Sequence, residues 1–295
     1  MSYTLKPLSP QVGRDAGAAD RQDSAGVNSP VQAPAYLVGW DVGGWNCDKN
    51  GENRDAIVIL DASLAIIGKS WRGNLRANIN AANTSEGWVQ TLFALCGAAS
   101  PPIASPITLA IDTPLGFSRA FVELVSRLNY VEPVNGSATN PYLFWQTERL
   151  PFEHGIRPLS AAKDMIGRQA TKGMQALAKF APKVARCGVW TNGVALAAIE
   201  AYPSPCKHLA LMDALLLPYE NWRQVNHQDI LDTRTCAFAY CFQVTPENVV
   251  QLSDDVSVSQ GWIWLPKDEC RLFFYRALPS HELAWPQSVG RLLIC

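Results

Sequence analysis

The sequence predicts an α/β protein, a three-layer sandwich with a mixed sheet whose first three strands are antiparallel and whose fourth and fifth are parallel. Two observations lead to this fold class. Three short apolar or alternating runs follow one another at 35–42, 55–61 and 64–71, which is the pattern of an antiparallel meander. The apolar runs at 107–112 and 194–203 each follow a helical segment, and a strand reached through a crossover helix lies parallel to an earlier one.

The elements of the first half follow in a regular order. AYLVGWDV, DAIVILD and LAIIGKSW are the strands of the meander, and the DASL between the second and third suits a tight hairpin turn. SEGWVQTLFALCGA has its apolar residues at helical spacing, with Thr84 or Ser85 as a candidate N-cap. ITLAIDTPLG predicts a buried strand that ends in a turn, and FSRAFVELVSRLN predicts an amphipathic helix.

The second half continues the alternation of strands and helices. The longest helical pattern lies at 159–180, VALAAIEAYP is the fifth strand, and two helices are expected around 206–217 and 228–243. GWIWLP, at 261–266, is a last strand. This order of elements is the ribonuclease H-like layout. Its core is shared with the actin-like ATPases, so the fold alone does not define the function.

Composition divides the chain into three parts. Residues 1–34 are rich in Ser, Pro, Gly, Ala, Gln and Asp without hydrophobic periodicity, which predicts a disordered leader. Residues 35–266 form the predicted ribonuclease H-like domain, with a helical and loop insertion around 130–185. Residues 267–295 form a C-terminal extension.

The bulk composition is that of a soluble protein, which we expect to be cytoplasmic. The formal net charge is −1, so no global attraction draws the chain to nucleic acid or to a membrane, and a partner must be sought in local patches. The 8 cysteines contain no CxxC pair, which predicts reduced thiols and not a zinc site or a disulfide scaffold. The N-terminus has no signal-peptide pattern, and no run of about 20 apolar residues predicts a membrane helix.

Several acids fall where burial is expected. Asp41 lies in the first strand, Asp112 ends the fourth, and Glu200 lies in the fifth; Asp229 and Asp232 share one face of the predicted helix at 228–243. Because the first and fourth strands are neighbours in such a sheet, Asp41 and Asp112 can converge, and the last helix can bring Asp229 or Asp232 to them.

Clustered carboxylates repel one another, and a divalent cation such as Mg²⁺ or Mn²⁺ removes that cost. Two such ions about 4 Å apart activate a water and stabilise the leaving oxygen in phosphodiester cleavage. The acids therefore predict a two-metal nuclease site, with Asp41, Asp112, Asp229 and Asp232 as ligands and Glu200 as a further candidate. The structural alternatives are that Asp112 caps a turn and that Asp229 is a helix N-cap.

Six segments together resemble a family of predicted RNase H-like nucleases, a widespread bacterial and archaeal group catalogued as a domain of unknown function. The segments, in order, are GWDVGGWNCDKNGENRDAIVILD, IDTPLG, NPYLFWQTERL with PLSAAKDMIG, IEAYP, DILDTRTCAFA and GWIWLP. The resemblance implies a metal-dependent nuclease whose catalytic acids are Asp41, Asp112, Asp229 and Asp232. The helical pair also resembles the pair of acids that closes the RuvC-type resolvase site. The chain departs from the family in its long loop after Asp41 and in Thr233, where the family more often has Ala.

A basic segment at 157–186 predicts contact with a nucleic acid, either DNA or RNA. It holds seven Lys and Arg against one acid, and such a stripe is the electrostatic footprint of a phosphate backbone. Arg168, Lys172 and Lys179 fall on one helical face, and Lys163 or Arg168 is a candidate phosphate contact. The alternative is a solvated helix face.

Two other functions remain open. A sugar-kinase-like or actin-like ATPase would use Gly43 and Gly44, in the D-x-G-G turn that begins with Asp41, to bind phosphate through backbone N–H groups. Such enzymes need a second phosphate loop, and no second glycine-rich loop follows a strand in this sequence. A catalytically inactive RNase H-like module that binds nucleic acid is the third reading.

Overall fold

The computed structural model describes residues 35–49, 53–63, 65–136, 139–145, 148, 159–203 and 263–264. By its contacts the chain divides into two units, Met1–Gln32 and Ala33–Cys295, and every described residue lies in the second. The predicted leader, the helices at 206–217 and 228–243 and the C-terminal extension lie outside the described residues. So do Asp229 and Asp232.

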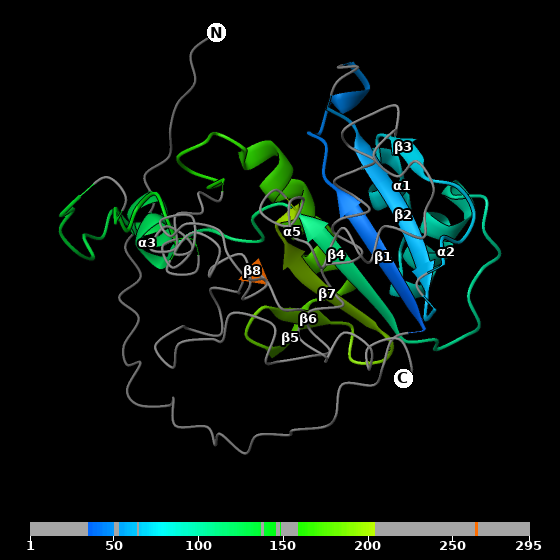
Figure 1. Ribbon diagram of the computed structural model, residues 1–295. Helices are drawn as coiled ribbons and strands as arrows, with labels where there is room; N and C mark the ends of the chain where they lie inside the picture. Colours follow the sequence, from blue (N-terminus) through cyan, green and yellow to red (C-terminus); the bar gives the residue numbers. More distant parts are fainter. Residues whose placement is uncertain are drawn as a thin grey trace, which may run out of the picture. The chain divides into compact units, whose positions relative to one another are not determined.

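An open mixed sheet organises the described part of the chain (Figure 1). Its strands are β1 (Tyr36–Asp41), β2 (Asp55–Asp61), β3 (Trp71–Gly73), β4 (Ile107–Asp112), β5 (Lys183–Arg186), β6 (Val189–Thr191), β7 (Leu196–Ala201) and β8 (Ile263–Trp264). Their order is β3-β2-β1-β4-β7-β6-β5, with β8 beside β7. β1, β2 and β3 pair antiparallel, whereas β1, β4 and β7 pair parallel. The predicted mixed α/β sheet, with β7 as its predicted fifth strand, is confirmed.

The third predicted strand is shorter than its apolar run. Within 64–71, Ile66 makes only an isolated bridge to Leu60, and the ladder resumes at Trp71. Gly68 separates the two stretches with φ +69°, and a Cβ at this position would lie 2.2 Å from the carbonyl oxygen of Cys96. The chain therefore turns at Gly68, which interrupts the strand.

The helices begin where local capping and backbone geometry allow. The described helices are α1 (Arg76–Ala81), α2 (Ser85–Leu95), α3 (Arg119–Arg127) and α5 (Gly167–Phe180), with a short 3₁₀ turn, η1 (Cys47–Lys49). Thr84 is the N-cap of α2, because its hydroxyl accepts from the N–H of Gly87 at 3.0 Å. α5 begins later than the helical pattern at 159–180 because Met165 takes φ +57°, which no α-helix accommodates.

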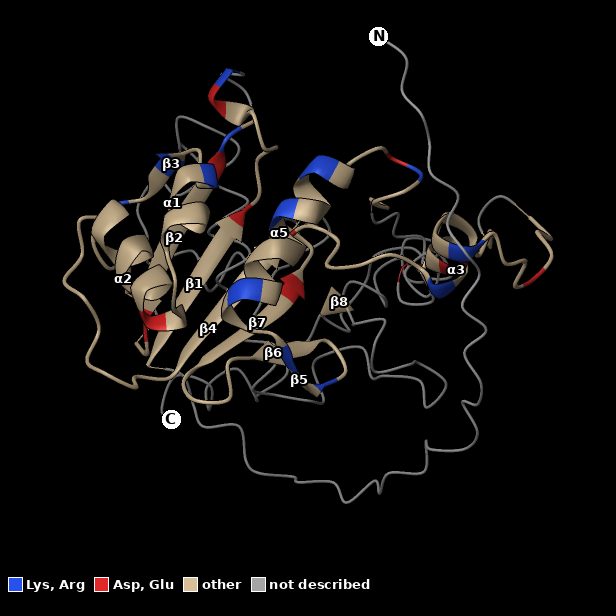
Figure 2. Ribbon diagram, turned by 180° about the vertical axis from the view of Figure 1, so that it is seen from behind, with Lys and Arg blue, Asp and Glu red and all other residues tan. Residues whose placement is uncertain are grey.

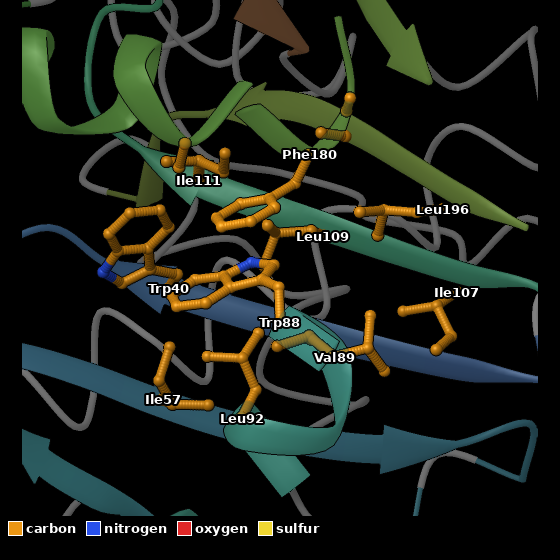
Figure 3. Packing of buried hydrophobic residues seen from close by; sticks show 14 of the residues in the cluster. Trp40, Ile57, Trp88, Val89, Leu92, Ile107, Leu109, Ile111, Phe180 and Leu196 are labelled. Carbon is orange, nitrogen blue, oxygen red and sulfur yellow. The ribbon is translucent and has the colours of Figure 1, made fainter. Parts of the chain in front are cut away.

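One face of the sheet packs against α1, α2 and α5 to form an aromatic core (Figure 3). Trp88 of α2 stacks on Phe180 of α5, with ring centroids 4.9 Å apart, and meets the edge of Trp40 of β1 at 6.1 Å. All three rings are buried. α5 lies in the range predicted as an insertion, yet its apolar face forms part of this core.

Two features complete the described fold. The hairpin of β5 and β6, which the sequence pattern did not indicate, extends the sheet beyond β7. Among the described helices, none has both the length and the apolar character needed to cross a membrane.

Candidate active site

Asp41 and Asp112 lie side by side at the ends of two neighbouring parallel strands. They are the last residues of β1 and β4 and are direct partners in the register of the two strands. Register partners on parallel strands point to the same face of a sheet. Both residues line one cleft of about 240 Å³. The predicted juxtaposition of the first and fourth strands is confirmed, and it brings these two acids together.

The cleft is formed where the carboxyl ends of β1, β4 and β7 meet the start of α5. Its polar lining includes the amide side chains of Asn53 and Gln169, and its apolar walls come from Leu159, Ile166 and Ile263. α5 approaches this edge closely because Gly173 faces the β4 turn. A Cβ at that position would lie 2.6 Å from Cγ2 of Thr113. A small residue here is therefore what lets the helix reach the cleft.

Glu200, the third predicted acid, lines the same cleft from β7. Its Oε2 accepts a hydrogen bond of 2.9 Å from the N–H of Leu115, three residues after Asp112. Burial raises the pKa of Glu200 well above its usual value; the Leu115 N–H opposes this, and the charges of Glu148 and Asp112 add to it. Glu200 is thus a buried acid whose neutral form is favoured and which also holds the turn after β4.

Glu148 is a second buried acid, whose charge acts on Glu200, and the sequence reasoning missed it. Its Oε2 accepts from the N–H of Trp145 at 2.9 Å, and its Oε1 has no hydrogen-bond partner within the described structure. Burial raises the pKa of Glu148 to about 8. It lies in NPYLFWQTERL, where neither a strand nor a helix period marks a residue as buried, so only its contacts reveal it.

The donor set in the cleft fits one hard divalent cation. Mg²⁺ is usually held by one or two carboxylates together with water and substrate phosphate, and Asp41 and Asp112 provide two carboxylates on one face. No group of three or more His, Cys, Asp or Glu residues able to hold a metal occurs among the described residues. The further ligands of the predicted two-metal site, Asp229 and Asp232, are outside that part of the chain.

A fully buried ion pair, which the sequence reasoning also missed, lies beside the cleft. Lys172 of α5 and Asp55 at the start of β2 are both 0% exposed, and their charged groups are in direct contact. Asp55 also accepts from Trp40 Nε1 at 3.1 Å, Gly43 N at 2.9 Å and Leu75 N at 2.7 Å. Burial raises the pKa of Asp55, and the Lys172 ammonium and these donors oppose that rise. The pair ties β1, β2 and α5 together.

The two glycines after Asp41 have different surroundings. A Cβ on Gly43 would lie 2.6 Å from the backbone N of Asp55, so the chain can pass β2 here only without a side chain. A Cβ on Gly44 would meet nothing closer than Cβ of Arg168, at 3.8 Å. The carbonyls of both glycines accept from Lys172, at 3.3 and 3.4 Å. Close packing against the backbone of β2 therefore requires a glycine at position 43.

The predicted basic stripe on α5 needs correction. Lys172 is wholly buried in its ion pair with Asp55 and presents no charge to a ligand, so its assignment as a nucleic-acid contact is wrong. The i, i+4 spacing places Lys172 near Arg168 on the helix. Arg168 is exposed to solvent, whereas Lys172 points into the protein and is buried. Figure 2 colours all the Lys and Arg positions along α5, including the buried one.

The other three candidates are exposed but not equally free. Lys179 donates to the carbonyls of Ile79 and Asn80, at 2.6 and 3.0 Å, at the end of α1. Lys163 forms an ion pair with Asp164 at 3.3 Å. Arg168 has no acidic partner among the described residues and lies in the first turn of α5, two residues from the cleft residue Ile166.

Comparisons with known proteins do not identify a relative. No family model, no curated protein and no solved structure matches this chain. The resemblance to the RNase H-like nuclease family therefore stays a prediction from the sequence.

Proposed function

We propose that this protein is a metal-dependent nuclease that hydrolyses phosphodiester bonds in nucleic acid. The observation that carries the proposal is the pairing of Asp41 and Asp112 at the carboxyl ends of β1 and β4, inside a cleft. Carboxylates on one face of adjacent parallel strands offer the oxygen ligands that Mg²⁺ or Mn²⁺ requires. Both acids line the same cleft of about 240 Å³.

The order of the strands supports the same proposal. An antiparallel meander, β3-β2-β1, is followed by the parallel strands β4 and β7 on its other side. This is the arrangement expected of a ribonuclease H-like sheet, in which catalytic acids end the first and fourth strands. The proposal places Asp41 and Asp112 in those two roles.

The chemistry divides between the bound cation and the residues of the chain. A divalent cation would supply an activated water and stabilise charge on the leaving oxygen. Asp41 and Asp112 hold their carboxylates on one face of the sheet, and Glu200 fixes the turn that follows Asp112 through Leu115. A second ion, as in a two-metal mechanism, would need Asp229 and Asp232 as additional ligands.

One observation weighs against the ATP phosphotransferase alternative. In that reading the N–H groups of Gly43 and Gly44 would bind phosphate. The N–H of Gly43 instead donates to the Asp55 carboxylate at 2.9 Å, and both glycine carbonyls accept from Lys172. A phosphate at Gly43 would have to displace a buried carboxylate from its donor.

The test is metal-dependent cleavage by the full chain. Single-stranded, duplex, branched and hybrid nucleic acids are incubated with Mg²⁺ or Mn²⁺, and in parallel with EDTA. Cleavage should require the metal and fall by at least about 100-fold in Asp41→Asn and in Asp112→Asn, the size of loss expected when an electrostatic catalytic contact is removed.

Asp61→Asn is the matched control, because Asp61 lies at the other end of β2, in register with Tyr36 and not with the cleft. Cleavage that persists in EDTA or in Asp41→Asn would overturn the proposal. Metal-independent binding of nucleic acid without cleavage would favour the inactive module. A nucleotide-dependent rise in melting temperature without cleavage would favour the phosphotransferase.

A further inference from the structure

The predicted basic stripe offers few unpaired cations for a phosphate backbone. Of the four basic residues predicted to bind nucleic acid, Lys172 is buried and Lys179 is bound to the end of α1. Lys163 forms an ion pair with Asp164. Of the four, this leaves Arg168 as the exposed residue without an acidic partner in the described part of the chain. Duplex DNA carries one charge per about 1.7 Å of axis, and proteins that bind its backbone commonly contact roughly 6–10 phosphates. These four candidates alone fall well short of that number.

The cleft offers polar groups of another kind. Asn53 and Gln169, which carry amide side chains, are among its lining residues, and neither makes a side-chain hydrogen bond among the described residues. An amide carries both donors and an acceptor, so it can pair with the edge of a nucleobase. Tyr202 is also among the lining residues, and bases stack on aromatic rings.

The size of the cleft limits what it can hold. Its volume of about 240 Å³ lies just below the range of small-molecule sites, roughly 300–1,000 Å³. Its apolar walls include Leu159 and Ile166, and no described residue of its lining is Lys or Arg. A space of this size with apolar walls and amide groups suits one nucleotide whose base has left the stack.

We infer that the cleft takes an unpaired nucleotide of a single strand, and not a base-paired duplex, with Asn53 and Gln169 contacting the base. This inference rests on the proposed nuclease function, which it narrows to single-stranded nucleic acid or to unpaired positions in a folded one. Arg168 contacts a phosphate beside that nucleotide. Asp41 and Asp112 face the bond to be cleaved.

Binding is measured separately from cleavage, so that the two proposals can fail separately. The full-length Asp41→Asn variant is titrated with a fluorescent single strand, with the same strand annealed to its complement, and with the strand carrying abasic positions. The single strand should bind at least about tenfold more tightly than the duplex or the abasic strand. Its log–log salt slope should be no steeper than about −1.4, the value for two phosphate contacts on a single strand.

Asn53→Ala and Gln169→Ala should each weaken single-strand binding by about fivefold, whereas Gln90→Ala, on the exposed side of α2, is the matched control. The inference would be overturned if the duplex bound as tightly as the single strand, or if the abasic strand bound as tightly as the intact strand. A salt slope steeper than about −4 would also overturn it. Cleavage by the unsubstituted chain would leave the nuclease proposal standing in each of those cases. Tight single-strand binding without any cleavage would support the inference and contradict the nuclease proposal.

Discussion

Lys172 of α5 holds its ammonium against the carboxylate of Asp55 with both side chains removed from solvent. The two residues are far apart in the chain, and their contact joins the start of β2 to a helix on the sheet. The carboxylate also binds the N–H of Gly43, two residues after Asp41. The turn at Gly43 and Gly44, which follows Asp41, is therefore held in place by this buried pair as well as by the pairing of β1 with its neighbouring strands.

Removal of the lysine charge should strongly destabilise the fold. Lys172→Met leaves Asp55 buried without its cation, and the loss of one partner of a buried pair costs about 3–5 kcal/mol. Urea unfolding followed by tryptophan fluorescence measures the change. Lys183→Met, on the exposed strand β5, is the control and should change the free energy of unfolding by less than about 0.5 kcal/mol. A loss of under about 1 kcal/mol for Lys172→Met would show that the pair does not stabilise the fold.

The two glycines of the Asp41 turn should respond differently to alanine. Gly43→Ala places a Cβ 2.6 Å from the backbone of Asp55, and such overpacking costs about 1–3 kcal/mol. Gly44→Ala adds a Cβ at an ordinary 3.8 Å from Arg168 and should change stability by less than about 0.5 kcal/mol. Melting temperatures of the two variants measure the difference. Equal effects would contradict the packing role of Gly43.

Glu148 should make the protein less stable as the pH rises. Its pKa is raised from 4.5 to about 8 in the folded state, so between these values the folded protein keeps a proton that the unfolded chain has lost. Unfolding then releases a proton, and the free energy of unfolding falls by up to about 1.4 kcal/mol per pH unit. The fall ends above about pH 8, where both states are ionised. Glu200, with its raised pKa, acts in the same direction.

The variant Glu148→Gln isolates the contribution of Glu148. Its stability relative to the unsubstituted chain should rise steadily from about pH 4.5 to about pH 8, as measured by urea unfolding at several pH values. Glu86→Gln, at an exposed position of α2, should show no such trend. A constant difference across this range would mean that Glu148 is ionised in the folded protein.

Arg168 and Lys179 should separate binding from stability. Arg168→Ala should weaken binding of a single strand and make its salt slope shallower by about 0.7, the share of one phosphate contact. Lys179→Ala should leave binding unchanged and lower stability by about 0.5–1.5 kcal/mol, because its ammonium donates to the carbonyls of Ile79 and Asn80. Fluorescence anisotropy and urea unfolding give the two readings. If Lys179→Ala weakened binding without changing stability, Lys179 would be a nucleic-acid contact after all.

Much of the sheet could be predicted because its signals are local. Apolar runs of strand length mark β1, β2, β4 and β7, and Thr84 marks the start of α2, since each depends on residues close together in the chain. The hairpin of β5 and β6 and the late start of α5 were not predicted. They depend on turn geometry and on the backbone at Met165, which no hydrophobic period records.

The site divides in the same way. Asp41 and Asp112 could be placed together, because the order of strands and helices determines which strand ends are neighbours. The buried state of Lys172 could not be predicted, since a lysine on a helix face is ordinarily solvated. Glu148 was hidden for a related reason, because its burial arises from a segment without secondary-structure periodicity.

The sequence by itself therefore determined β1, β2, β4 and β7 and the two acids that end β1 and β4, because hydrophobic periodicity and connection order are properties of the chain. Only the tertiary structure decided which charges face solvent. In the folded protein Lys172 points inward and pairs with Asp55, and Lys179 donates to carbonyls of α1. The close approach of the β2 backbone leaves no room for a side chain at Gly43. The physical reason is that burial and ion pairing depend on distances between segments that are remote in sequence, and no local pattern carries those distances.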